Sequence, residues 1–197
     1  MPRTEADDLD ARMTFLLEAD RLKTVSRATR LADGTRFENS AEHSWHLTLF
    51  ALTLAPHAPT GVSIDRVIRM LILHDLVEID AGDVPIFAAG TQDTRTQDAA
   101  EARAADRIFN LLPQAEAQAF RALWDEFEAA RTPDAIFAKS LDRFQPPNLN
   151  LANGGGSWTD YDVTEEEVRT RVGPRIARGA PTLWAWLEPR IAAFFAR

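Results

Sequence analysis

Cysteine is absent from the 197-residue sequence. Disulfide scaffolds, thiolate metal sites and cysteine nucleophiles are therefore excluded together. Long apolar runs are also missing, because no stretch approaches the roughly 20 residues that a helix needs to span a bilayer. Residues 1–8 are too acidic and too polar for a signal peptide. We therefore expect a protein of the cytoplasm that does not associate with membranes.

Basic residues are fewer than acidic ones. The sequence has 22 lysines and arginines against 30 aspartates and glutamates, which gives a formal net charge of −8. Because surfaces that bind nucleic-acid polymers are usually strongly basic, we do not expect such a polymer as a partner. A small phosphorylated molecule remains compatible, since a metal ion and two or three arginines can make one pocket positive inside an acidic protein.

Helical spacing of apolar residues recurs along the whole chain, whereas the strict alternation of a half-buried strand is scarce. The length suits one domain, so we expect an all-α, single-domain protein. The expected helices cover about residues 6–25, 39–55, 63–82, 96–112, 114–130, 132–146 and 164 onward, with a last one after Pro181. Residues 26–37 are expected to form a polar connection and residues 153–157 a glycine-rich loop.

Boundary residues support several of these helices. Asn39 with Glu42, and Thr164 with Glu167, have the spacing of a capping box at a helix start. The first helix is expected to have an apolar stripe made of Leu9, Met13, Leu16, Leu17 and Leu22.

Two of the four histidines are expected to face the interior. His43 has the helical spacing of Leu47 and Phe50, and His74 has that of Met70 and Leu71. A single histidine on an apolar face is more often a core residue than a ligand, so neither histidine alone indicates a site.

The neighbours of His74 change that interpretation. Asp75 follows directly, and Glu78 lies about one helical turn further on. Burying these carboxylates without a cation would be costly. The helix is expected to end at Gly82, so its negative dipole end also favours a cation nearby. The cluster therefore predicts a bound metal ion.

Four short motifs together resemble the H…HD…D signature of the HD-domain phosphohydrolases. They are Glu42-His43-Ser44, His74-Asp75-Leu76-Val77-Glu78, Ala81-Gly82-Asp83 and Leu141-Asp142. The sequence looks most like the 5′-deoxynucleotidase-like branch. The resemblance covers about residues 9–145 and leaves 148–197 as a C-terminal helical extension. It implies a single-domain HD-type helical bundle, often dimeric, so we expect a homodimer.

The resemblance also implies a role for each matching residue. One divalent ion would have four protein ligands: His43, His74, Asp75 and Asp142. Glu78 would act as the nearby acid or base. Arg27 would hold the substrate phosphate, with Arg30 and Arg36 as alternatives in the same connection, and Asp83 would face the sugar.

The expected ligands also bear on the metal itself. Nitrogen and oxygen ligands without thiolate suit Mn²⁺, Fe²⁺, Co²⁺ or Zn²⁺ better than Mg²⁺ or Ca²⁺. The sequence has no histidine after His74. HD proteins with two metals generally add histidines between the His-Asp pair and the last aspartate, so a single ion is expected.

The leading functional hypothesis is a metal-dependent 5′-nucleotidase that hydrolyses nucleoside monophosphates, with deoxy forms preferred. Two features keep alternatives open: Ala28 follows Arg27 where that branch commonly has an aromatic residue, and the C-terminal third matches the branch poorly. One alternative is a phosphohydrolase for another small phosphate or a nucleoside triphosphate. The other is a nucleotide-binding module without turnover.

Overall fold

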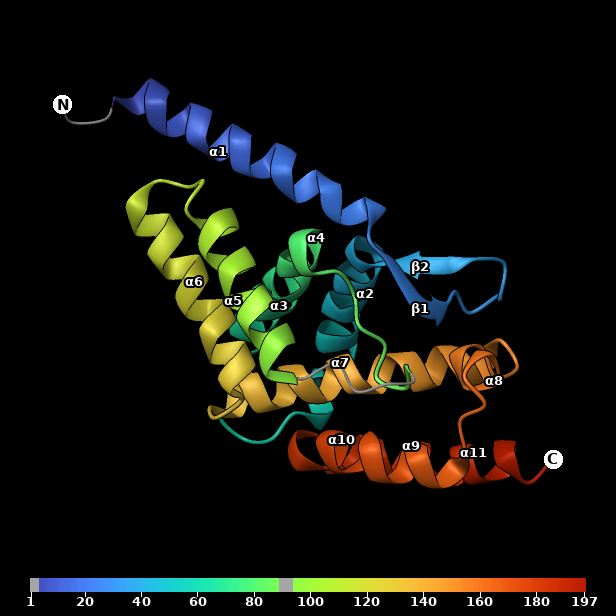
Figure 1. Cartoon of the computed structure of the whole chain (residues 1–197). Coiled ribbons are helices and arrows are strands. Elements are labelled where there is room, and N and C mark those ends of the chain that lie inside the picture. The colour runs from blue at the N-terminus through green and yellow to red at the C-terminus, as the bar shows by residue number, and fades with distance from the viewer. Residues whose placement is uncertain (1–3, 89–93) are drawn as a thin grey trace.

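A long central helix, α7 (Pro133–Ala152), crosses the middle of the fold and packs against α2, α3, α6, α10 and α11 (Figure 1). The Thr132 side chain caps it by accepting a hydrogen bond from the backbone N–H of Ala135. Pro133 occupies the first turn, where a backbone N–H is not needed. The structure is a computed structural model, and it describes residues 4–88 and 94–197.

Helices make up nearly all of the regular structure, so the predicted all-α class is confirmed apart from one small hairpin. The elements before α7 are α1 (Glu5–Asp20), η1 (Arg21–Thr24), β1 (Ser26–Arg30), β2 (Phe37–Asn39), α2 (Ser40–Thr53), η2 (Ala55–His57), α3 (Ile64–Leu73), η3 (His74–Val77), α4 (Glu78–Ala81), α5 (Thr94–Phe109) and α6 (Gln114–Ala129). Those after it are α8 (Ser157–Asp160), α9 (Glu165–Arg171), α10 (Gly173–Gly179) and α11 (Pro181–Phe195).

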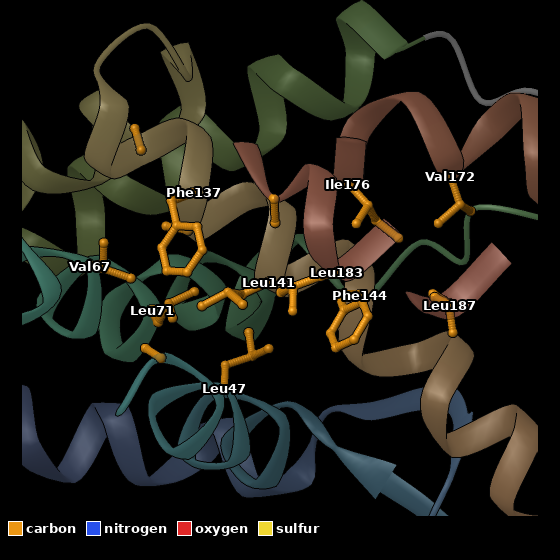
Figure 2. Close-up of a cluster of buried hydrophobic side chains, with 14 of the residues drawn as sticks. Leu47, Val67, Leu71, Phe137, Leu141, Phe144, Val172, Ile176, Leu183 and Leu187 are labelled. Carbon is orange, nitrogen blue, oxygen red and sulfur yellow. The ribbon is translucent and has the colours of Figure 1, made fainter. Parts of the chain in front are cut away.

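The main hydrophobic cluster joins α7 to helices from both ends of the chain. Figure 2 shows side chains of α2, α3, α7 and the C-terminal helices together, among them Leu47, Leu71, Phe137, Leu141, Phe144, Ile176, Leu183 and Leu187. Phe137 and Leu141 are 0% exposed. The C-terminal helices therefore share one core with α2, α3 and α7, and α7 is held from several sides.

The apolar stripe predicted for the first helix is wrong as a packing surface for four of its five residues, whereas the fifth, Leu22, is buried in η1. The exposed fractions of Leu9, Met13, Leu16 and Leu17 lie between 48% and 69%. The side of α1 that meets the domain instead carries Phe15, whose ring centroid lies 5.8 Å from that of Phe120. The helix also ends at Asp20, before the predicted end at 25, because the chain passes through η1 into the hairpin.

The predicted polar connection at 26–37 is wrong in part, because it contributes to an antiparallel hairpin. In this hairpin Ser26 of β1 faces Asn39 of β2, and Arg30 faces Phe37. Both strands are short and mostly polar, so they lack the alternation by which a strand is recognised in a sequence.

The helix predicted over 63–82 is interrupted at His74. Helix α3 ends at Leu73, and His74–Val77 form a tighter 3₁₀ turn before α4. Gly82 ends α4 with a φ of 75°, as expected for a glycine at a helix end.

Helix α7 continues to Ala152, so the end predicted at Pro146-Pro147 is wrong. Each proline removes one backbone donor, which normally weakens a helix. Burial favours the continuation here, because Pro147, Leu149 and Asn150 beyond the first proline are all buried. Both predicted capping boxes are confirmed. The glycine-rich loop is confirmed as well, with positive φ angles at Gly154, Gly155 and Gly156.

Replacing a central core residue gives a direct test of this packing. We expect Leu141→Ala to lower the free energy of unfolding by about 2–5 kcal/mol, because it leaves a cavity in the middle of the cluster. The matched control is Leu16→Ala, whose side chain is 56% exposed. That change should cost less than about 0.5 kcal/mol in urea denaturation. A loss as large as that of Leu141→Ala would show that the exposed face of α1 is covered in solution.

Candidate metal centre

Three buried side chains from separate elements converge beside α7. His43 comes from the first turn of α2, His74 from η3 and Asp142 from the middle of α7. One ligand atom from each lies within 4.8 Å of the others. His43 Nε2 is 3.1 Å from Asp142 Oδ1, and His74 Nε2 is 3.8 Å from the same oxygen. Such a group of nitrogen and oxygen ligands can hold a metal ion.

Asp75 adds a second carboxylate to this cluster. Its Oδ1 lies 2.9 Å from His74 Nε2, and its exposed fraction is 7%. The structure thus brings together the four residues predicted as ligands: His43, His74, Asp75 and Asp142. Their role in binding a metal remains a prediction.

The orientation of His74 fits a metal ligand. Its Nδ1 lies 2.8 Å from the carbonyl oxygen of Leu71, which favours a proton on Nδ1 and leaves a lone pair on Nε2. Within residues 4–88 and 94–197, the buried Nε2 faces Asp75 Oδ1 at 2.9 Å and Asp142 Oδ1 at 3.8 Å without a well-aligned hydrogen bond to either. Two neutral imidazoles and two carboxylates would carry a charge of about −2, which a divalent cation balances.

Electrostatics in the cluster favour extra positive charge. Burial and the positive charge of Arg27 lower the pKa of His43, but its contacts with the carboxylates of Asp142 and Glu38 outweigh them and raise the pKa to about 9. Burial raises the pKa of Asp142, but Arg143 and then His43 hold it well below its usual range. His43 therefore carries a proton at neutral pH, and metal binding here would release it.

Arg27 lies at the centre of a group of acidic side chains beside the cluster. Its Nη1 is 2.9 Å from Asp75 Oδ2. The same nitrogen is 3.5 Å from Glu78 Oε1 and 3.4 Å from Asp83 Oδ1. The structure therefore places the three further predicted site residues, Arg27, Glu78 and Asp83, next to the four candidate ligands.

The other two arginines of the hairpin point elsewhere. Arg30 pairs with Asp160 at 3.2 Å. Arg36 forms two hydrogen bonds with the Glu42 carboxylate. Neither lines the cavity at the cluster, whereas Arg27 does. Of the three arginines, Arg27 is therefore the one that lines the cavity at the cluster.

Glu78 lies in an unusual environment for a carboxyl group. Burial, followed by the negative charge of Asp75, raises the pKa of Glu78 to about 9. The hydroxyl of Ser40 donates a hydrogen bond of 2.5 Å to Glu78 Oε2. Perturbed carboxyls in a cavity are candidates for proton transfer.

Glu38 is a site residue that the sequence analysis missed. It is 2% exposed, and its Oε1 lies 3.4 Å from His43 Nδ1. Its Oε2 accepts a hydrogen bond of 3.0 Å from Gln145 Nε2. A carboxylate behind a ligand histidine fixes the ring and increases its basicity. No motif spacing marks Glu38, because its position depends on the hairpin that the sequence did not reveal.

A cavity of about 380 Å³ opens beside the cluster. Its walls include Arg27, His74, Asp75, Glu78, Asp83 and Asp142. Another cavity, of about 470 Å³, lies between α2, α7 and α11 and is lined by none of the predicted site residues. The smaller cavity is therefore where a substrate could meet the candidate metal ligands.

The sequence profile of a family described as HD domain matches residues 19–184. The chain belongs to the HD-domain family. This confirms the resemblance drawn from the motifs around His43, His74 and Asp142. The match extends beyond the predicted core at 9–145 into the C-terminal helices.

Comparison with solved structures adds a similar protein of similar length. The crystal structure of a predicted metal-dependent phosphohydrolase from Magnetospirillum magnetotacticum MS-1 has 43% sequence identity to this HD-domain chain. The alignment covers 95% of each chain with a TM-score of 0.87.

Two more distant relatives have named activities. The 5′-deoxynucleotidase hdd1 of Schizosaccharomyces pombe is 27% identical over 134 residues, which is 66% of each protein. The human 5′-deoxynucleotidase HDDC2 is 26% identical over 132 residues, 66% of this chain and 62% of the relative. The match thus spans slightly less than two thirds of each of these relatives.

The contact between Glu38 and His43 gives a prediction about metal affinity. We expect Glu38→Gln to weaken Mn²⁺ or Co²⁺ binding by about 10–100-fold, because the amide cannot support the His43 ring as a carboxylate does. The matched control is Glu42→Gln, which alters an exposed ion pair with Arg36 on the same segment. Isothermal titration with each metal measures both variants. Equal affinities for the two would contradict the role of Glu38.

Proposed function

We propose that this HD-domain protein is a metal-dependent phosphohydrolase that acts as a 5′-nucleotidase on nucleoside monophosphates, with deoxy forms preferred. One observation carries the proposal: the four candidate ligands form a buried cluster beside Glu78 and Arg27, on the wall of one cavity. The relatives named 5′-deoxynucleotidase, at 26–27% identity, support the substrate class.

The cluster is proposed to hold one divalent ion through His43, His74, Asp75 and Asp142. Mn²⁺, Co²⁺, Fe²⁺ and Zn²⁺ suit this ligand set best. When bound, such an ion polarises a phosphoryl group and lowers the pKa of water. Orientation of the ligands comes from the chain itself, through Glu38 behind His43 and the Leu71 carbonyl behind His74.

Glu78 is proposed to move the proton in the reaction. Ser40 engages its Oε2, while its Oε1 lies on the side of Arg27. A carboxyl with its pKa raised to about 9 holds a proton at neutral pH. Oε1 would therefore give its proton to the oxygen of the leaving nucleoside and regain one from the attacking water. General acid–base catalysis of this kind contributes about 10²–10⁴-fold to the rate.

Arg27 and Asp83 are proposed to bind the substrate. The Arg27 guanidinium has five N–H donors, and its buried Nε makes no hydrogen bond within the described part of the chain. Nε faces Glu38 Oε1 at 3.7 Å, so a role in holding a phosphate oxygen would fall to the N–H donors of Arg27 that reach the cavity. Asp83 Oδ1 lies 3.4 Å from Arg27 Nη1. From this position the Asp83 carboxylate could accept a hydrogen bond from a sugar hydroxyl.

Two further expectations remain predictions from the sequence: a location in the cytoplasm and a homodimer. None of the helices within residues 4–88 and 94–197 has the length and apolar character that crossing a bilayer requires. Light scattering of the purified protein would decide the subunit count.

Phosphate release from a panel of nucleotides tests the proposal. The protein loaded with Mn²⁺ or Co²⁺ should release inorganic phosphate from 5′-monophosphates, faster from deoxyribonucleotides than from ribonucleotides. Equal rates of phosphate release from deoxyribonucleotides and ribonucleotides would contradict the proposed preference for deoxy forms. Binding of nucleotides with no turnover would instead identify a binding module and reject the enzymatic proposal.

Glu78→Gln separates proton transfer from binding. We expect kcat to fall by about 10²–10⁴-fold while bound metal and nucleotide affinity remain, because the amide keeps the shape but cannot carry the proton. Glu101→Gln is the matched control, since Glu101 lines the same cavity and hydrogen-bonds to Gln97 at 2.9 Å. Steady-state kinetics together with metal analysis measures both, and full activity in Glu78→Gln would reject its assigned role.

A further inference from the structure

Three arginines line the same cavity as the candidate metal ligands. Arg143 follows Asp142 on α7, Arg171 ends α9 and Arg175 lies on α10, which packs against α7. They therefore reach the cavity from α7 and the C-terminal helices, away from the hairpin that supplies Arg27. The proposed mechanism uses none of the three.

Few carboxylates pair directly with these arginines, although seven acidic residues also line the cavity: Asp75, Glu78, Asp83, Asp98, Glu101, Glu128 and Asp142. Arg143 has one carboxylate partner, with its Nε 3.6 Å from Asp142 Oδ2. Arg171 donates to the carbonyl oxygen of Ile86 and lies over the Phe87 ring. It forms no close ion pair with a carboxylate of the described residues, although its charge adds, after the hydrogen bonds from Thr164, to the lowering of the pKa of Glu167. The Arg175 guanidinium has neither an ion-pair partner nor a hydrogen-bond partner among them.

The arginines also repel one another. Burial, followed by the positive charge of Arg143, lowers the pKa of Arg175. The negative charge of Asp142 opposes this shift, and Arg171 lowers the pKa further. Like charges held at one cavity wall are unfavourable unless an anion binds between them. This grouping is more informative because the whole chain has a formal net charge of −8.

We propose that Arg143, Arg171 and Arg175 form an anion subsite that takes a second phosphate group of the substrate. This inference rests on the proposed phosphohydrolase function and extends its substrate class. The reacting phosphate would lie at the metal cluster beside Arg27, and a further phosphate of the same nucleotide would meet the three arginines. The site therefore accepts nucleotides with more than one phosphate and binds them more tightly than monophosphates.

Arg175→Gln is the sharpest test, because the guanidinium has no described partner whose loss would unfold the protein. In the wild type loaded with Mn²⁺, KM should be lower for deoxyadenosine triphosphate than for the monophosphate. The variant should raise KM for the triphosphate about tenfold, equivalent to about 1.4 kcal/mol. Its KM for the monophosphate should change less than twofold. Arg178→Gln on the same helix should change neither value, because Arg178 binds the Ala130 carbonyl and does not line the cavity.

A stability measurement supplies a second readout without turnover. Inorganic tripolyphosphate should raise the Tm of the wild type and of Arg178→Gln more than that of Arg175→Gln. The Tm of Arg175→Gln without added anion should equal or exceed that of the wild type, because a repulsion is removed. An equal effect of the variant on both nucleotides, or no effect on the triphosphate, would overturn the subsite.

The outcomes separate this inference from the proposed function. If no nucleotide is hydrolysed, the enzymatic proposal fails, while tripolyphosphate binding still decides whether the subsite exists. If Arg175→Gln weakens the binding of inorganic phosphate but leaves KM for the triphosphate unchanged, a free anion occupies the subsite. The assignment to a substrate phosphate would then be wrong.

Discussion

The structure depends on a concentration of buried negative charge at the junction of α2, η3 and α7. Asp75 and Asp142 are 7% and 6% exposed, and Glu38 behind them is 2% exposed. Such groups cannot all be ionised away from water unless positive charge is brought to them. In the chain itself, Arg27, Arg143 and a protonated His43 supply that charge. A cation that replaces the His43 proton would take over its part of the balance, which is the physical reason to expect one at this place.

The fold arranges the elements around this requirement. Helix α7 supplies Asp142 and is held by the main hydrophobic cluster, so its position is fixed by packing. The capping box at Asn39 starts α2 just before His43, which places that histidine in the first turn. The hairpin brings Arg27 and Glu38 to the opposite side of the same cluster. Tightening of the chain into η3 sets His74 beside Asp142.

Much of this arrangement was predictable because its signals are local. Short segments of sequence are enough to recognise the capping boxes, the glycine at 82 and the helical spacing around His43. The parts that were missed depend on distant contacts. The hairpin that carries Glu38 is made of two short strands with mostly polar side chains, which give no recognisable strand pattern. The continuation of α7 beyond Pro146 depends on burial that no local pattern reveals. In α1 a local signal was misleading. Leu16 and Leu17 have the helical spacing of an apolar stripe, but both side chains are exposed.

The central claim is that four side chains from three elements share one cation, and anomalous diffraction tests it most directly. Crystals of the protein loaded with Mn²⁺ or Co²⁺ should show one strong peak, about 2.0–2.2 Å from both Nε2 atoms of His43 and His74 and from oxygens of Asp75 and Asp142. A peak that lacks Asp142, a second peak in the cavity, or no peak at the cluster would contradict the account.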